Sequence, residues 1–302
     1  MLKTQSKLQG IPLYYSNDRL GTNILYNISS FVYAHKFNLP LLCSPNLNTN
    51  SIFLTTFKGM TASHNKNAEI NNSNLDYLLN YESFINKYSR GIFNRYPSEL
   101  DFYGIHYLTC TSIKQDYFSY FRNKLLSKYS QIIQELARFQ KYKLPFDPKK
   151  TICIHVRLGD VTTWQEGSHA ECNDVFVDYL NKEDMDSCRK GCKYRQAPIR
   201  KDKLISLIKE AKAKYPNREI ITFTNPGQDL GLPYRCLTSN DQDLDLYLLC
   251  QSEVLISSRS TFGMIPLLFN NLKEAWIPKW CVSAVTGLNT KFDLNSLNIT
   301  YY

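Results

Sequence analysis

Residues 151–160 read Thr-Ile-Cys-Ile-His-Val-Arg-Leu-Gly-Asp, an apolar run that turns abruptly polar. The β-branched residues of the first half predict a short buried strand. The second half places an imidazole at His155, a guanidinium at Arg157 and a carboxylate at Asp160. Ligands of open α/β sheets bind at the carboxyl ends of strands, so this segment predicts an anion-binding strand end. The alternative is an ordinary ion pair between Arg157 and Asp160 on a surface turn.

Length and composition indicate a globular protein. The chain has 302 residues, 43% of them hydrophobic and 21% charged, which is enough to build the cores of two domains. The net charge of +9 predicts an affinity for anions. The basic residues are scattered and form no long run, so we do not expect nucleic acid as a partner.

The sequence shows no pattern typical of a signal peptide or of a membrane span. The N-terminus has no apolar segment, and no apolar run reaches the roughly 18 residues that a membrane helix needs. We therefore expect a soluble protein, cytoplasmic in a bacterium or a virus-infected host. The alternative is a domain trimmed from an anchored Golgi-lumenal protein.

The cysteines indicate reduced thiols. There are nine, an odd number, and most stand alone in apolar contexts. Cys172, Cys188 and Cys192 lie together in a charged insertion, but no fourth ligand follows at a spacing typical of zinc sites. We therefore expect a surface loop there, with a disulfide or a metal site as the alternative.

The first half of the chain begins like a Rossmann-like unit. A strand predicted at 11–15 leads through a Gly-containing loop into a helix with helical spacing of apolar residues and Thr22 as its N-cap. The next elements expected are a strand at 39–43, peripheral loops at 46–80 and a helix at 118–139. A Pro-containing linker at 143–150 then separates two predicted domains, 1–145 and 146–302.

In the second half, strands and helices alternate. Residues 161–200 are polar and predict a long functional loop. The elements expected beyond it are a helix at 201–215, a strand at 218–224, a helix at 243–251, a strand at 253–257 and an apolar helix that ends at Phe269. This alternation predicts a parallel sheet covered on both faces, and the two halves together predict an α/β protein with two Rossmann-like domains facing a cleft.

A second strand end is also polar. Hydroxyl side chains gather around Arg259 at positions Ser257, Ser258, Ser260 and Thr261, between a predicted strand and a predicted helix. Hydroxyl and backbone N–H groups at such a position donate hydrogen bonds to phosphate oxygens. The alternative is helix capping by Ser260 or Thr261, which requires no ligand. Two polar strand ends in one half favour a diphosphate ligand.

Three segments, 18–23, 155–160 and 245–262, resemble motifs of one family. The chain resembles the fucosyltransferase superfamily that carries a His-x-Arg motif, the alpha-1,2-, alpha-1,6- and protein O-fucosyltransferases. The order and spacing of the three segments are similar too, and the resemblance spans about residues 11–272. It implies the GT-B fold, in which two Rossmann-like domains with parallel sheets face each other across a cleft and the C-terminal domain holds the donor.

The resemblance also implies roles for individual residues. Arg157 would bind the donor's β-phosphate and stabilise the leaving diphosphate, while His155 and Asp245 would recognise guanine. The other implied donor-binding residues are Ser258, Ser260, Thr261 and Phe262. The residues implied to line the cleft from the N-terminal domain are Arg19, Gly21 and Asn23. No metal or other cofactor is implied, because enzymes of this family transfer the sugar with inversion and without a metal.

The chain departs from the family pattern in three places. Leu158 stands where an Arg commonly follows the motif Arg, and Gly263-Met264 replaces an aromatic pair. The acidic residue that serves as general base has no unambiguous counterpart. Its candidates, in order of preference, are Glu166, Asp160 and His169. These changes lie near the donor pocket, so the identity of the sugar stays open.

The prediction is an inverting, metal-independent glycosyltransferase that uses GDP-fucose, with a glycan hydroxyl of an oligosaccharide or glycoprotein as acceptor. One alternative is another GDP- or UDP-linked sugar, UDP-xylose included. A second is a non-catalytic protein that binds nucleotide sugars or glycans. The Asp241-Gln-Asp243 segment imitates a metal-binding Asp-x-Asp motif, but its place before a predicted helix favours an acidic helix start.

Overall fold

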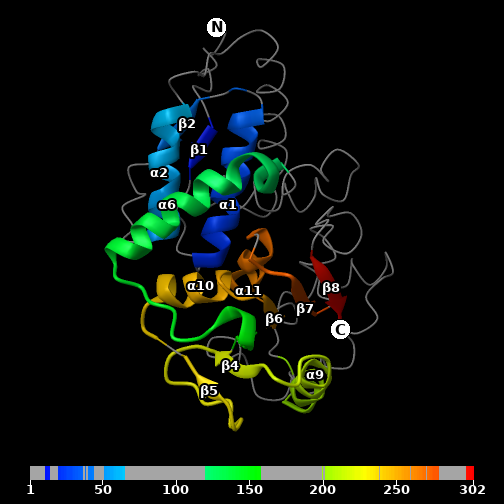
Figure 1. The fold of residues 1–302 in the computed structure, drawn as a ribbon. Helices are drawn as coiled ribbons and strands as arrows, with labels where there is room; N and C mark the ends of the chain where they lie inside the picture. Colours follow the sequence, from blue (N-terminus) through cyan, green and yellow to red (C-terminus); the bar gives the residue numbers. More distant parts are fainter. Residues whose placement is uncertain are drawn as a thin grey trace, which may run out of the picture. The chain divides into compact units, whose positions relative to one another are not determined.

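The computed structural model describes the elements drawn as ribbons in Figure 1. The described residues are 11–13, 20–36, 38, 40–43, 51–64, 120–157, 199, 201–237, 239–258, 260–269, 271–278 and 297–302. The chain divides into two compact units, Met1–Leu136 and Ala137–Tyr302. The loop predicted at 161–200, with its three cysteines, lies outside the described residues apart from Ile199.

The first unit contains two parallel strands, β1 (Ile11–Leu13) and β2 (Leu41–Cys43), joined by helix α1 (Leu20–Lys36). This confirms the predicted order of strand, helix and strand. The N-cap predicted at Thr22 was wrong, because the helix already begins at Leu20, whose side chain is buried. Gly21 therefore lies in the first turn of α1 and not in a loop.

Helix α2 (Ile52–His64) occupies part of the segment that we expected to form peripheral loops. That prediction was wrong because the apolar residues outweigh the polar composition: Phe53, Phe57 and Met60 are buried at helical spacing. The Tyr129 ring packs on Phe57 with the ring centroids 4.7 Å apart, and its hydroxyl donates to the Phe53 carbonyl at 3.0 Å.

The helix predicted at 118–139 is confirmed as two consecutive elements. A single π-helical turn, η1 (Phe121–Leu125), leads into α6 (Leu126–Phe139). Phe121 and Tyr129 are both buried and form a T-shaped contact, with the ring centroids 5.4 Å apart. The aromatic stripe of this helix therefore belongs to the core.

The second unit is built on a six-stranded parallel sheet with the strand order β5-β4-β3-β6-β7-β8. Its strands are β3 (Thr151–His155), β4 (Glu219–Phe223), β5 (Arg235–Cys236), β6 (Val254–Ser257), β7 (Glu274–Ile277) and β8 (Asn298–Tyr301). The predicted strand β3 lies in the middle of the sheet and is buried along its whole length. A parallel strand with both faces covered is apolar throughout, as its sequence is.

Helices cover both faces of this sheet, as predicted. Helix α9 (Lys201–Lys214) packs on one face against Ile152 and Ile154 of β3. On the other face lie α10 (Gln242–Cys250), α11 (Thr261–Met264) and the 3-10 turn η4 (Ile265–Leu268), where Cys153 joins their core. Figure 1 shows α10 and α11 close to β6.

The strand order reverses beside β3. The chain runs from β3 outward to β4 and β5, then returns across the sheet through α10 and places β6 on the other side of β3. This is the topological switch point of the sheet, the position at which open α/β sheets generally bind their ligands. The fold therefore points to the carboxyl ends of β3 and β6 as the place for a ligand.

Candidate functional site

The carboxyl ends of β3 and β6 are joined directly. His155 lies opposite Ser257 in the parallel register. The N–H of Ser258 donates to the His155 carbonyl at 2.9 Å, and the N–H of Arg157 donates to the Ser258 Oγ at 2.8 Å. The two polar segments that the sequence singled out therefore lie side by side. We call this group of residues the switch-point site: His155, Arg157, Ser257 and Ser258, together with Phe262, which packs against His155.

His155 faces the same layer as α10 and α11. Alternate residues of a strand share a face, and Cys153 packs in the core beneath α10. The His155 ring lies against Phe262, with centroids 5.5 Å apart and an angle of 30° between the ring planes. Phe262, near the start of α11, thus packs against the imidazole.

Gly263 allows the backbone of α11 to come close to the two strand ends. A Cβ atom at this position would lie 2.8 Å from the His155 Nδ1 and would overlap the Ser257 Oγ even more closely. The backbone of α11 can therefore approach the two strand ends only because this residue has no side chain. An aromatic residue would not fit here.

Arg157 is almost fully buried, with 8% of its surface exposed. Transferring a guanidinium from water to the protein interior costs roughly several kcal/mol unless negatively charged groups surround it. The hydrogen bond from the Arg157 N–H to Ser258 holds the backbone of Arg157 in place, so the position of its Cα at the switch-point site is defined. A planar, permanently charged group in such a place can bind a phosphate through two parallel hydrogen bonds.

Asp245 lies in the first turn of α10, which begins at the carboxyl edge because it connects β5 to β6. Only 7% of its surface is exposed. Its Oδ2 accepts a long hydrogen bond, 3.5 Å, from the N–H of Ser239, while its Oδ1 receives none from any described residue. Burial raises the pKa of Asp245 to about 6; the charge of Asp241 adds to this, and the Ser239 hydrogen bonds reduce it.

Asp241 and Asp243 form the beginning of α10. The Asp241 carboxylate caps the helix by accepting from the N–H groups of Asp243 at 2.9 Å and Leu244 at 3.1 Å. It also accepts a short hydrogen bond, 2.5 Å, from the Tyr142 hydroxyl. These contacts agree with the acidic helix start that we preferred to a metal-binding motif. Among the described residues, no three or more His, Cys, Asp or Glu side chains lie close enough together to hold a metal ion.

The hydroxyl cluster is divided between two roles. The Ser258 Oγ accepts the hydrogen bond from the Arg157 N–H, so it holds the strand end in place. Ser260 occupies the N-cap position of α11, yet its side chain makes no capping hydrogen bond. The capping alternative is therefore wrong for Ser260. Thr261 is half-buried at the first position of the same helix.

Four of the predicted site residues, Arg19, Asp160, Glu166 and His169, lie outside the described residues. Gly21 and Asn23 belong to α1 of the first unit, where Asn23 is buried and its carbonyl accepts from the Asn27 Nδ2 at 2.9 Å. Of the predicted donor-binding residues, the structure brings together His155, Arg157, Ser258 and Phe262.

Two further residues at this edge were missed by the sequence reasoning. Thr224 follows β4 directly, beside β3, and its buried Oγ1 has no hydrogen-bond partner among the described residues. Tyr302 donates its hydroxyl to the Ser257 carbonyl at 2.6 Å from the end of β8. The polar residue after a buried strand was a usable signal for Thr224. No local signal marked Tyr302, because only the order of the strands in the sheet brings the end of β8 near β6.

Comparison of the chain with family models, with curated proteins and with solved structures found no match. Over the part of the chain that the structure describes, no helix has the length and apolar character needed to cross a membrane.

Proposed function

We propose that the protein is an inverting, metal-independent glycosyltransferase that uses GDP-fucose and transfers the sugar to a hydroxyl of an oligosaccharide or glycoprotein glycan. The observation that carries the proposal is the buried Arg157, held beside His155 and Ser258 at the topological switch point of a parallel sheet. A dinucleotide or nucleotide-sugar diphosphate is the ligand class that suits such a position.

Asp245 supports guanine as the base. A carboxylate can accept hydrogen bonds from the N1–H and the exocyclic amine of guanine together, and uracil offers no such adjacent pair of donors. The Oδ1 of Asp245 is buried and receives no hydrogen bond from a described residue, so it has an acceptor position to fill. A ligand donor at this oxygen would offset the cost of burying the carboxylate.

In the proposed reaction, the acceptor hydroxyl attacks the anomeric carbon and transfers its proton to a carboxylate base, Glu166 or Asp160. The bond between that carbon and the β-phosphate oxygen breaks, and GDP leaves with the electron pair. Negative charge develops on the diphosphate at this step, so a fixed guanidinium stabilises the transition state more than the ground state. Arg157 would supply this charge, which other glycosyltransferases obtain from a metal ion.

The donor is tested by thermal unfolding with GDP, GDP-fucose, UDP and UDP-xylose. A ligand that binds only the folded state stabilises it by about 2.7 kcal/mol at one hundred times its dissociation constant. We expect GDP and GDP-fucose to raise the midpoint and the uridine nucleotides to leave it unchanged. A shift with UDP and none with GDP would reject the role of Asp245 and favour a UDP-sugar, UDP-xylose included.

Transfer is tested separately through Arg157. The Arg157→Lys variant keeps the charge but loses the two-pronged geometry, and we expect kcat to fall roughly tenfold or more; Arg157→Ala should cost on the order of a hundredfold or more. Circular dichroism and the unfolding midpoint check that both variants fold. Near-normal turnover in Arg157→Ala would overturn the mechanism.

A second candidate is a non-catalytic protein that binds nucleotide sugars. It is favoured by one observation: the residues that form the switch-point site are groups suited to holding a ligand, with Arg157 and Ser258 joined by a hydrogen bond. Donor binding without release of GDP in the presence of a panel of glycan acceptors would support this candidate. Acceptor-dependent release of GDP would exclude it.

A further inference from the structure

A second concentration of positive charge lies at the opposite edge of the sheet. It surrounds a hollow of about 270 Å³ lined by Lys149, Lys150 and residues 214–218, which we call the basic pocket. Lys149 and Lys150 end the 3-10 turn η2 (Pro148–Lys150) just before β3, and residues 214–218 connect α9 to β4. Both walls therefore lie at the amino ends of strands. Since β3 has five residues, the pocket is about 16 Å from the switch-point site.

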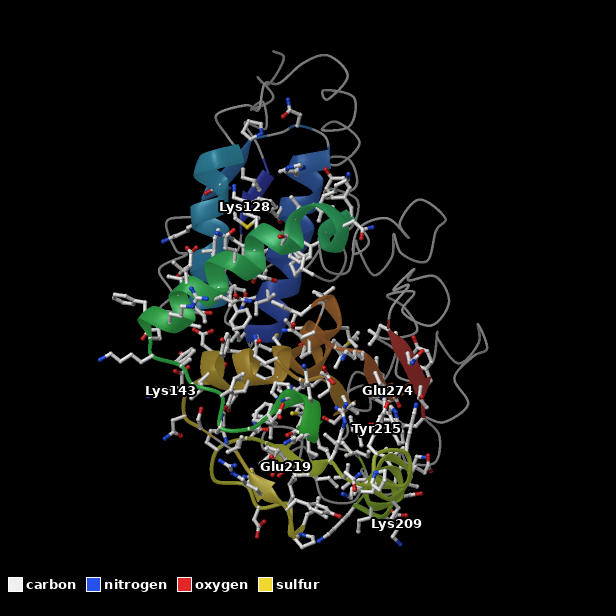
Figure 2. All side chains as sticks on the ribbon, in the orientation of Figure 1. Lys128, Lys143, Lys209, Tyr215, Glu219 and Glu274 are labelled. Carbon is white, nitrogen blue, oxygen red and sulfur yellow. The ribbon has the colours of Figure 1, made fainter. Side chains whose placement is uncertain are left out.

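One wall is fixed by buried carboxylates. The Lys214 Nζ and the Tyr215 hydroxyl both donate to Glu274 at 2.6 Å, and Figure 2 shows Tyr215 near Glu274. Arg218 pairs with Glu253 at 3.0 Å and lies over the Tyr215 ring, 4.9 Å from its centroid. These contacts order the cationic side chains before any ligand arrives, which lowers the entropic cost of binding.

The other wall is fixed through its backbone. The Asp147 carboxylate caps η2 by accepting from the Lys149 N–H at 3.0 Å. The Arg218 Nη1 donates to the carbonyls of Pro148 at 3.4 Å and Thr151 at 3.3 Å, so it joins the two walls. The backbone of the lysine pair is thereby held in place at the mouth of the basic pocket.

Among the described residues, the carboxylates around the basic pocket are engaged elsewhere than with the lysine pair: the Asp147 carboxylate accepts from the Lys149 backbone N–H and Glu219 accepts from the Thr151 hydroxyl. Glu274 and Glu253 neutralise Lys214 and Arg218, and Glu253 is shared with Lys273 at 2.6 Å. Lys149 and Lys150 are exposed, and neither forms an ion pair with a carboxylate of the described residues. Two ammonium groups at a preformed hollow attract a compact ligand with at least two negative charges.

We propose that the basic pocket is a second anion-binding site, specific for a small ligand that carries a diphosphate or two adjacent phosphate groups. The site is independent of the proposed glycosyl transfer. One small diphosphate cannot reach from the basic pocket, at the amino ends of the strands, to the switch-point site at their carboxyl ends. Because Lys149 and Lys150 are exposed, binding should weaken strongly as salt rises.

The test is lysine reactivity measured by mass spectrometry after acetylation of the whole protein, with pyrophosphate as the probe and sodium chloride at equal ionic strength as the reference. We expect the acetylation rates of Lys149 and Lys150 to fall about threefold or more. A bound anion covers the two amines and favours their protonated, unreactive form. Lys143 and Lys209, exposed and labelled in Figure 2, should keep their rates. Equal protection of all four lysines, or protection of none, would overturn the proposal.

Calorimetry with variants separates this site from the switch-point site. We expect pyrophosphate binding to be weakened tenfold or more in the Lys149→Ala/Lys150→Ala protein and to persist in Lys143→Ala/Lys209→Ala, which loses the same charge elsewhere. Arg157→Ala supplies the converse variant: pyrophosphate binding that depends on Lys149 and Lys150 should persist in it while GDP binding at the switch-point site is lost, so failure of one site leaves the other open to its own test. Unchanged pyrophosphate affinity in the Lys149→Ala/Lys150→Ala protein would reject the basic pocket.

Discussion

Ser258 connects the two halves of the switch-point site through two hydrogen bonds to the segment around Arg157. Its Oγ accepts from the Arg157 N–H at 2.8 Å, and its own N–H donates to the His155 carbonyl at 2.9 Å. The end of β6 thereby extends the pairing with β3 beyond the last regular strand residues. The position of the buried guanidinium depends on a serine that stands 101 residues away in the sequence.

Replacing Ser258 should loosen this connection. In Ser258→Ala the buried N–H of Arg157 loses its acceptor, and we expect the free energy of unfolding to fall by about 1–3 kcal/mol. GDP should also bind more weakly, because Arg157 is no longer held. Denaturant unfolding measures the first effect and calorimetry the second.

Ser260→Ala is the matched control for stability. Ser260 is also buried, but its side chain makes no capping hydrogen bond. We expect Ser260→Ala to lower the free energy of unfolding by less than Ser258→Ala does. If both variants unfold at the same denaturant concentration as the parent protein, the structural role of Ser258 is wrong.

Gly263 should not tolerate a side chain. In Gly263→Ala the new methyl group overlaps Ser257 and lies 2.8 Å from the His155 Nδ1, so α11 must move away from the strand ends. Overpacking of this kind costs about 1–3 kcal/mol. Gly59→Ala is the control, since nothing lies within 4 Å of a Cβ there and the residue sits in α2. That variant should be neutral or more stable by about 0.5–1 kcal/mol.

Asp245 should make stability fall between about pH 4 and pH 6. Its pKa is raised from 3.8 to about 6, so the folded protein holds a proton that the unfolded chain has released in this interval. Stability therefore declines as pH rises through the window and is level above it. In Asp245→Asn this contribution is absent, and the difference between the two curves, on the order of 2 kcal/mol, isolates the residue. Parallel curves from pH 4 to pH 7 would refute the assignment.

Glu274 should behave in the opposite way. Burial acts to raise its pKa, but hydrogen bonds from Lys214, Tyr215 and Trp276 outweigh this, so the pKa is lowered overall. A lowered pKa contributes stability above the unfolded value of 4.5, and this is lost as the pH falls through the folded value. We expect Glu274→Gln to lose about 1–3 kcal/mol at neutral pH and less in acid, as measured by urea unfolding. A loss independent of pH would contradict this.

Much of the second unit was predictable from local patterns. Strands β3, β4 and β6 are continuous apolar runs, and α9 and α10 have helical spacing, so their positions agree with the sequence to within a residue or two. Strands β5, β7 and β8 were not predicted. β5 has only two residues and both are exposed, while β7 begins with Glu274, a residue that is unfavourable in strands. The buried Glu274 carboxylate is satisfied by Lys214 and Tyr215 at the end of α9 and just beyond it, which no local pattern reveals.

The sequence by itself determined that His155, Arg157 and the serines after β6 stand at the ends of buried strands, because an apolar run that turns polar is a local property of the chain. It also determined the parallel sheet, since alternating strands and helices leave few other ways to bury both faces. Only the tertiary structure decided that β6 returns to the side of β3, which makes Ser258 the partner of Arg157 and excludes a side chain from Gly263. Strand order and close approach depend on contacts between residues far apart in the chain, and these form only when the whole sheet is packed.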